Sequence, residues 1–410
     1  MRKNTFVFVS ILLLLLFSTQ IVVSDEEYDN KNPYENLVQI ELELFNFSSI
    51  YQNKSMPGFD TYNQAIKLVS EYPLTAYNLL LNCYRNTLSN SLLEKIKVLG
   101  GKKVAETFLS DNQDNLSTIV HKTNDIIPKT FASLEWLDLA KREIMDANKY
   151  LDQAMKSYNK KDYNSTVAYL IFMNSSIHKA NGFAFLANER NRINIIFTNT
   201  SKLLNSVKKV ASKWIDFAES TIDFYENIGY QKYSLHSRQI LNQSKEYYSN
   251  KLYYIAIMNA VYAKTLVEYY THEYLTYREY PSASSSCKTY LNWTELIMNS
   301  VYNAIDVDAP FAKSMLEQAQ LHLQDELKEK DKSNASAIAR LSIQESLIAG
   351  QQAQAVLDLR HAVEQDLNIL YALPGASGEG TPGGLNMNQV GIVFLVIGIG
   401  MIVLGWFLRK

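Results

Sequence analysis

Apolar residues return every three or four positions along most of this chain, and few residues interrupt the pattern. Eight prolines and 15 glycines are spread over 410 residues. A spacing of three and four places side chains on one face of an α-helix, so the sequence predicts helices almost throughout. We therefore expect an all-α fold: an elongated array or bundle of antiparallel helical hairpins, plus one C-terminal transmembrane helix.

Two long stripes illustrate the pattern. The first is made of Leu134, Leu137, Ala140, Ile144, Ala147, Leu151, Ala154 and Tyr158. The second is made of Val207, Val210, Trp214, Phe217, Thr221, Phe224 and Ile228. Each predicts an amphipathic helix whose apolar stripe packs against a neighbouring helix.

An internal repeat with a period of 90 residues supports hairpins. Its first copy contains Leu151, Gln153, Tyr158, Lys161 and Tyr163, and its second contains Leu241, Gln243, Tyr248, Lys251 and Tyr253. A short polar turn follows the first tyrosine of each copy, and an apolar helix follows the turn. Leu316, Gln318 and Ala319 open a third copy, with a polar stretch at residues 328–334.

The order of tyrosine, polar turn, tyrosine and helix resembles the hairpins of tetratricopeptide-type helical-repeat proteins. This resemblance implies stacked antiparallel helices. The overall layout is also similar to the helical, membrane-tethered part of archaeal Lon-like surface proteases. The serine-lysine catalytic domain of that family has no counterpart in this sequence.

The C-terminal segment 390–408 is apolar throughout and is followed by Arg409 and Lys410. At about 1.5 Å per residue it reaches roughly the thickness of a hydrocarbon core, so it predicts a membrane-spanning helix with its basic end in the cytoplasm. Small residues at Gly391, Gly398 and Gly405 lie on one stripe of this helix, where another copy of the helix would pack. We therefore expect contact with the lipid bilayer, and a homo-oligomer is possible through this stripe.

The N-terminal segment has the pattern of a secretion signal. Arg2 and Lys3 precede an apolar run at residues 6–17, and Ser24 precedes the acidic Asp25. Cleavage after Ser24 would place the following residues outside the cell, in a single-pass type I topology.

Composition changes divide the chain between these ends. Glycine and proline are concentrated at residues 374–384, which predicts a flexible linker, and Gly100 and Gly101 suggest an earlier boundary. We expect a signal peptide at 1–24, a helical or irregular region at 25–129, a helical-hairpin ectodomain at 130–372, a linker at 373–389, a transmembrane helix at 390–408 and a cytoplasmic tail at 409–410.

Acceptors for N-glycosylation are frequent between the signal and the membrane segment. The Asn-x-Ser/Thr pattern occurs at Asn46, Asn53, Asn115, Asn164, Asn174, Asn199, Asn242, Asn292 and Asn334. Their spread over the whole ectodomain predicts a glycosylated exterior. Asn174 is the exception, because it falls near the apolar face of its helix.

Cys83 and Cys287 are the two cysteines of the chain. In an oxidising compartment they could form one long-range disulfide, or they could be two buried thiols. Their separation in sequence does not decide between these alternatives.

No pattern of catalytic, metal or nucleotide chemistry stands out. The six histidines are far apart in sequence, and there is no glycine-rich phosphate loop or glycine elbow around a serine. His272 beside Glu273 is interpreted as a solvated pair. The paired carboxylates Asp306 and Asp308 could serve acid-base catalysis but are more often structural.

Ten tyrosines crowd residues 247–280, and we interpret them as amphipathic core residues between helices, although exposed tyrosines also suit protein and carbohydrate contacts.

The net charge of −2 with interspersed signs argues against a nucleic-acid partner. We expect no cofactor and no metal, the sequence offers no catalytic residue, and a non-enzymatic protein is favoured over an enzyme. The expected function is a glycosylated surface scaffold that binds proteins; the alternative is a tethered accessory subunit or remnant of a surface hydrolase.

Overall fold

A computed structural model describes residues 32–45, 51, 58–191, 200–273, 280–304 and 306–367. The chain divides into two compact units, Met1–Leu367 and Asn368–Lys410, and the described residues all belong to the first. Their secondary structure is helical without a strand, which confirms the all-α class. Among them no helix combines the length and apolarity needed to cross a membrane. The predicted signal, linker and membrane segment lie outside the described residues, as does the stripe of Gly391, Gly398 and Gly405.

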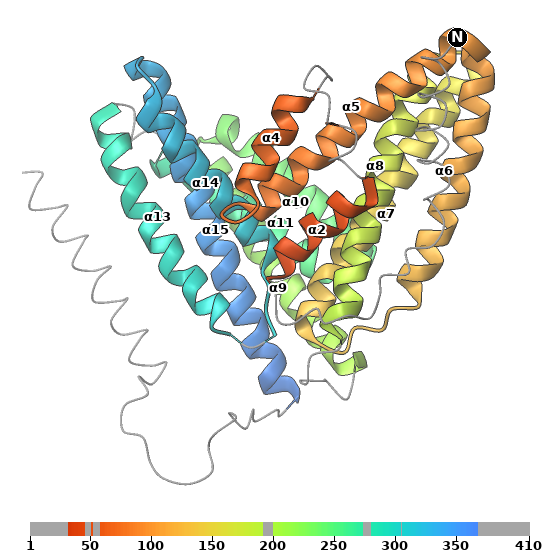
Figure 1. Ribbon diagram of the computed structural model, residues 1–410. Coiled ribbons are helices and arrows are strands. Elements are labelled where there is room, and N and C mark those ends of the chain that lie inside the picture. The colour runs from red at the N-terminus through yellow and green to blue at the C-terminus, as the bar shows by residue number, and fades with distance from the viewer. Residues whose placement is uncertain are drawn as a thin grey trace, which may run out of the picture. The chain divides into compact units, whose positions relative to one another are not determined.

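Twelve α-helices and one π-helical turn make up the described part of the chain (Figure 1). The helices are α2 (Pro33–Phe45), α4 (Phe59–Leu68), α5 (Pro73–Leu99), α6 (Gly101–Asn124), α7 (Phe131–Asn159), α8 (Tyr163–Arg190), α9 (Thr200–Asn227), α10 (Gln231–Ser249), α11 (Tyr253–Glu268), α13 (Tyr280–Tyr302), α14 (Pro310–Lys328) and α15 (Lys332–Leu367), and the π-helical turn η1 (Tyr269–Glu273) follows α11 directly.

Neighbouring helices pair as hairpins because the turns between them are short. Helices α7 and α8 pack along each other, and so do α10 with α11 and α14 with α15. Helix α11 is central among the helices that follow α8, and it contacts α7, α9, α10 and α15. Helices α2, α5 and α6 pack on α8. Gly100 separates α5 from α6 inside the first unit, so it marks a helix corner and no division between units.

The 90-residue repeat is a repeat of structure as well as of sequence. After α7, the Lys161 N–H donates to the Tyr158 carbonyl at 2.8 Å and the Asp162 N–H donates to the Ser157 carbonyl at 3.0 Å. The same two bonds recur 90 residues later, from Lys251 to Tyr248 and from Leu252 to Tyr247. This is the Schellman ending of a helix, which places one residue in the left-handed region.

Lysine occupies the left-handed position in both turns, with φ of 60° at Lys161 and 63° at Lys251. The turn from α9 to α10 has the same pair of bonds, but there the position is Gly229, with φ of 101°. A side chain at positive φ costs about 1 kcal/mol relative to glycine. The two lysine turns are therefore less favourable than the glycine turn.

We expect Lys161→Gly and Lys251→Gly each to raise the free energy of unfolding by about 0.5–1 kcal/mol, because relief of the left-handed strain exceeds the added freedom of the unfolded chain. Urea denaturation followed by circular dichroism measures the change. Lys160→Gly is the matched control, since Lys160 has φ of −81° and gains nothing from glycine. Equal loss of stability at positions 160 and 161 would contradict this account of the turn.

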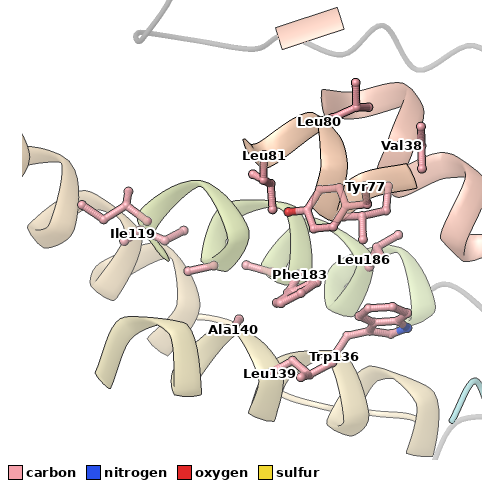
Figure 2. Close-up of a cluster of buried hydrophobic side chains, with 14 of the residues drawn as sticks. Val38, Tyr77, Leu80, Leu81, Ile119, Trp136, Leu139, Ala140, Phe183 and Leu186 are labelled. Carbon is pink, nitrogen blue, oxygen red and sulfur yellow. The ribbon is translucent and has the colours of Figure 1, made fainter. Parts of the chain in front are cut away.

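The first stripe of the sequence is buried as predicted, since none of its eight side chains is exposed. Figure 2 shows Trp136, Leu139 and Ala140 of α7 facing Phe183 and Leu186 of α8. The Trp136 and Phe183 ring centroids lie 5.6 Å apart. Side chains of α2, α5 and α6 complete this core cluster, among them Val38, Tyr77, Leu80, Leu81 and Ile119.

The second stripe is not buried as predicted. Phe217, Phe224 and Ile228 are 51%, 57% and 52% exposed, and Val207 alone among the seven is fully covered. The face of α9 that enters the core is an adjacent one, formed by Leu203, Val207, Ala211, Ile215, Ala218, Ile222 and Tyr225. Helix α9 thus carries two neighbouring apolar faces, and its partners α10, α11 and α15 cover one of them.

Candidate interaction surface

The glycosylation acceptors differ in their access to solvent. Asn164, Asn242, Asn292 and Asn334 are exposed, and Asn115 is half-buried. Asn46, Asn53 and Asn199 lie outside the described residues. The four exposed acceptors belong to α8, α10, α13 and α15, so the helices have room for glycans at several places.

The Asn174 acceptor is buried. Its side chain is 7% exposed, and its Nδ2 donates to the Asn112 Oδ1 at 3.0 Å, while its Oδ1 accepts the Tyr84 hydroxyl. A glycan would break this buried pair and open the contact between α6 and α8. Glycosylation at Asn174 stays a prediction, and the burial of its amide makes this acceptor less accessible than the four exposed ones.

The two cysteines are free and fully buried. Cys83 belongs to the core cluster around α5 and α7, and Cys287 belongs to a separate cluster with Tyr269 and Ile343. The Cys287 Sγ lies 3.0 Å from the Ser342 Oγ. Of the two alternatives the sequence left open, the structure has buried thiols and no disulfide.

The described histidines are dispersed as the sequence suggested. Within the ranges that the structure describes, no group of three His, Cys, Asp or Glu side chains could hold a metal ion. His272 is exposed, and its Nε2 lies 2.5 Å from the Tyr225 hydroxyl.

The described tyrosines of the crowded region pack between helices. Tyr254 and Tyr269 are buried, and Tyr247, Tyr248, Tyr253, Tyr262 and Tyr270 are half-buried. The rings of Tyr248 and Tyr253 meet edge to face at 5.3 Å, as those of Tyr158 and Tyr163 do at 5.6 Å. The interpretation as core residues is confirmed for these seven.

The paired carboxylates Asp306 and Asp308 belong to a buried polar cluster. Asp308 Oδ1 accepts Arg190 Nη2 at 2.7 Å, and its Oδ2 accepts Arg190 Nε at 2.7 Å. Its Oδ2 also accepts the Trp136 indole N–H at 2.6 Å. The backbone carbonyl of Asp308 accepts the Tyr34 hydroxyl. This aspartate thereby ties the segment before α14 to α2, α7 and α8.

Asp306 and Glu135 cap helices in a reciprocal way. Asp306 accepts the N–H groups of Phe131 at 2.6 Å and Ala132 at 3.1 Å, the first residues of α7. Glu135 of α7 in turn accepts the N–H groups of Asp308 at 2.8 Å and Ala309 at 3.2 Å, just before α14. The first N–H groups of a helix lack partners within the helix, and a carboxylate there also interacts favourably with the helix dipole.

Burial sets the protonation of these carboxyl groups. It raises the pKa of Asp306 to about 6, despite the N–H groups that bind the carboxylate. Burial and the neighbouring Asp308 carboxylate raise the pKa of Glu135 well above its usual value. Both effects follow from the cost of a charge in a region with little water. A raised pKa is one mark of a catalytic group, but the oxygens described here already bind backbone N–H groups of the protein's own helices.

Two more buried carboxylates cap helices from a distance. Asp138 accepts the Tyr254 N–H at the start of α11 at 3.0 Å. Glu317 of α14 accepts the N–H of Thr75 at 2.8 Å and that of Leu74 at 3.3 Å, at the start of α5.

Sequence reasoning missed these remote caps, but a signal for them exists. Helices α5, α11 and α14 start after Tyr72, Leu252 and Ala309, and none of these residues has a side chain that caps a helix. By contrast, α7 and α8 have local caps from Thr130 and Asp162. In α5, α11 and α14, a start without Ser, Thr, Asp or Asn thus coincides with a carboxylate cap from another part of the chain.

The exposed apolar stripe of α9, formed by Val210, Trp214, Phe217, Thr221, Phe224 and Ile228, remains as the candidate interaction surface. Trp214 is half-buried and its ring lies 5.8 Å from that of Phe217. Leu235 of α10, 65% exposed, follows the Gly229 corner. Aromatic side chains with large exposed area are enriched in protein interfaces.

Charged side chains border this stripe. Lys264 of α11 places its ammonium 5.1 Å from the Phe217 ring centroid, while it also pairs with Glu268 at 2.7 Å. On α10, Arg238 pairs with Asp223 and Glu226 of α9, each at 2.6 Å. Helix α9 is therefore fastened to its neighbours, and the apolar stripe is held in a defined position.

Comparison with protein-family models, with curated proteins and with solved structures gave no match. The resemblances to tetratricopeptide-type hairpins and to Lon-like surface proteases accordingly stay predictions.

Proposed function

We propose that this chain is a membrane-anchored, glycosylated surface protein that binds another protein through the exposed stripe of α9. The observation that carries the proposal is the exposure of Phe217, Phe224 and Ile228 on one helix. Three large apolar side chains that are half exposed along one stripe are unfavourable in water, and a protein partner would cover them.

Topology supports the same function. The predicted signal at 1–24 and the predicted membrane helix at 390–408 would place the helical unit outside the cell, in a type I orientation. The predicted linker at 373–389 would let the unit pivot on its anchor. Exposed acceptors such as Asn164 and Asn292 suit a glycosylated exterior.

The alternative, an accessory subunit or remnant of a surface hydrolase, has less support. The carboxylates that could serve hydrolysis, Asp306 and Asp308, bind helix N-termini, an arginine and an indole. Those contacts give them a structural role.

Photocrosslinking tests the proposal. With p-benzoylphenylalanine at position 224 in the full chain on intact host cells, we expect a discrete covalent adduct with a protein. Leu296 on α13 is the matched control, since it is 68% exposed and lies outside the stripe. Adducts at both positions, or at neither, would refute a specific protein-binding stripe on α9.

A further inference from the structure

We infer that the partner of the α9 stripe is a second copy of this chain, packed antiparallel through α9 about a two-fold axis. This inference rests on the proposed function, because it names the occupant of the same surface.

The steps between successive residues of the stripe have the same order from either end of α9. Its steps along α9, from Val210 to Ile228, are four, three, four, three and four residues, with the midpoint at position 219. A stripe with alternating steps of three and four is the seam of a coiled coil. An antiparallel pair centred on position 219 places Trp214 opposite Phe224 of the partner subunit and Phe217 opposite Thr221 of the partner subunit. Phe217 would therefore meet a smaller side chain, and Trp214 would meet another aromatic one.

Contacts within the chain cover this seam only in part: Trp214 packs against the core between α9, α10 and α11, and Lys264 lies beside the Phe217 ring. The buried face of α9, which includes Val207, Ala211 and Ala218, already packs on neighbouring helices. Phe217 and Phe224, in contrast, leave half of their surface in solvent. A second α9 could lie on the stripe without displacing a helix of the first chain.

Charge favours the antiparallel direction. Lys213 is exposed beside the stripe in the N-terminal half of α9, and Asp216 and Asp223 are exposed towards its C-terminal half. Antiparallel packing brings Lys213 near the acidic half of the other α9, where Asp223 of the partner subunit also pairs with Arg238 of its own chain at 2.6 Å. Parallel packing would instead place the two lysines at the same level of the seam. Antiparallel helices also oppose their dipoles. An interface that uses the same patch on both copies must be complementary to itself in this way.

Glycans leave the seam accessible. No Asn-x-Ser/Thr acceptor falls within α9. The exposed acceptors Asn164, Asn242, Asn292 and Asn334 belong to other helices.

The dimer should be weak in solution. A standard interface buries about 800 Å² on each partner, more than a stripe of six residues supplies, so we expect a dissociation constant in the micromolar range, about 8 kcal/mol in binding free energy. The predicted membrane anchor would confine the copies to a surface and raise their effective concentration.

Disulfide trapping in the full chain distinguishes the possible arrangements. The native thiols Cys83 and Cys287 are buried and do not interfere. Near the axis, Ser220→Cys should give a covalent dimer under mild oxidation. Lys213→Cys alone should give at least tenfold less dimer, because the two copies of position 213 lie at opposite ends of the seam. Lys213→Cys combined with Asn227→Cys should restore the dimer, because these positions face each other across the axis.

A second variant links trapping to the apolar stripe. Phe224→Asp should lower trapping at Ser220→Cys by at least tenfold, while Leu296→Asp, at a position that is also more than half exposed but lies on α13, should leave it unchanged. Far-UV circular dichroism checks that both variants keep their helices. Trapping through Lys213→Cys alone at the level of Ser220→Cys would exclude antiparallel packing centred near position 219 and overturn the inference. Failure of Ser220→Cys to trap, with position 224 still crosslinking to a different protein, would overturn the inference and keep the proposed function.

Discussion

Replacing Asp308 by alanine is expected to lower the free energy of unfolding by about 4 kcal/mol. The substitution removes the acceptor of three hydrogen bonds at once, two from Arg190 and one from the indole of Trp136. Trp136 is fully buried and Arg190 is largely covered, so water does not easily replace the lost oxygens. Removing one partner of a buried ion pair typically costs about 3–5 kcal/mol. A domain is usually stable by only about 5–15 kcal/mol, so the variant would be near the limit of folding.

Asp308→Asn should lose nearly as much as Asp308→Ala. The amide keeps one oxygen but turns its NH₂ group towards a guanidinium or indole donor, so at least one donor stays without an acceptor. Chemical denaturation of both variants measures the loss. Asp152→Ala on α7, the helix that carries Trp136, is the control, because Asp152 pairs with Lys156 at 2.6 Å in an exposed position and should change stability by less than about 0.5 kcal/mol. Equal effects at positions 152 and 308 would show that the buried cluster does not hold the helices together.

Replacing Glu41 by glutamine is expected to stabilise the protein at pH 8 by about 4–5 kcal/mol. Glu41 is buried on α2, its Oε1 has no hydrogen-bond partner, and burial raises its pKa to about 8 although Lys179 opposes the shift. Below pH 4.5 the carboxyl is protonated in both the folded and the unfolded chain and costs no charge burial. As the pH rises from 4.5 to 8, the unfolded chain releases the proton and the folded chain retains it, so stability falls by about 1.4 kcal/mol per pH unit.

The gain from Glu41→Gln should therefore grow with pH. We expect a difference below about 1 kcal/mol at pH 5 and the full difference at pH 8, measured as urea midpoints across this range. Glu43→Gln on the same helix is the control, because Glu43 is exposed. A gain that is independent of pH would show that Glu41 does not carry the buried proton.

Much of the helical structure could be predicted from the sequence because its causes are local. The stripe along α7 follows the helical period, and its side chains are buried as expected. The turns at Lys161 and Lys251 recur with the sequence repeat, and positions 90 residues apart make the same backbone hydrogen bonds.

The buried cluster could not be predicted in the same way. The spacing of Asp306 and Asp308 suggested a pair of carboxylates, but their partners Phe131 and Arg190 are more than 100 residues away. A carboxylate that caps a distant helix has no sequence period, since only the packing of α7, α8 and α14 brings donor and acceptor together. The one sequence signal of this cluster was Ala309 before α14, because an alanine side chain cannot cap a helix.

Helix α9 distinguishes what the sequence determines from what the tertiary structure determines. By itself the sequence determined that α9 is amphipathic, because the spacing of apolar residues around a helix is a property of the residues. Tertiary structure decided which apolar face is covered: α10, α11 and α15 pack on Val207, Ala211 and Ala218, and Phe217 and Phe224 stay exposed. Burial depends on whether a neighbouring helix is present on that side, and the spacing within one helix carries no information about its neighbours.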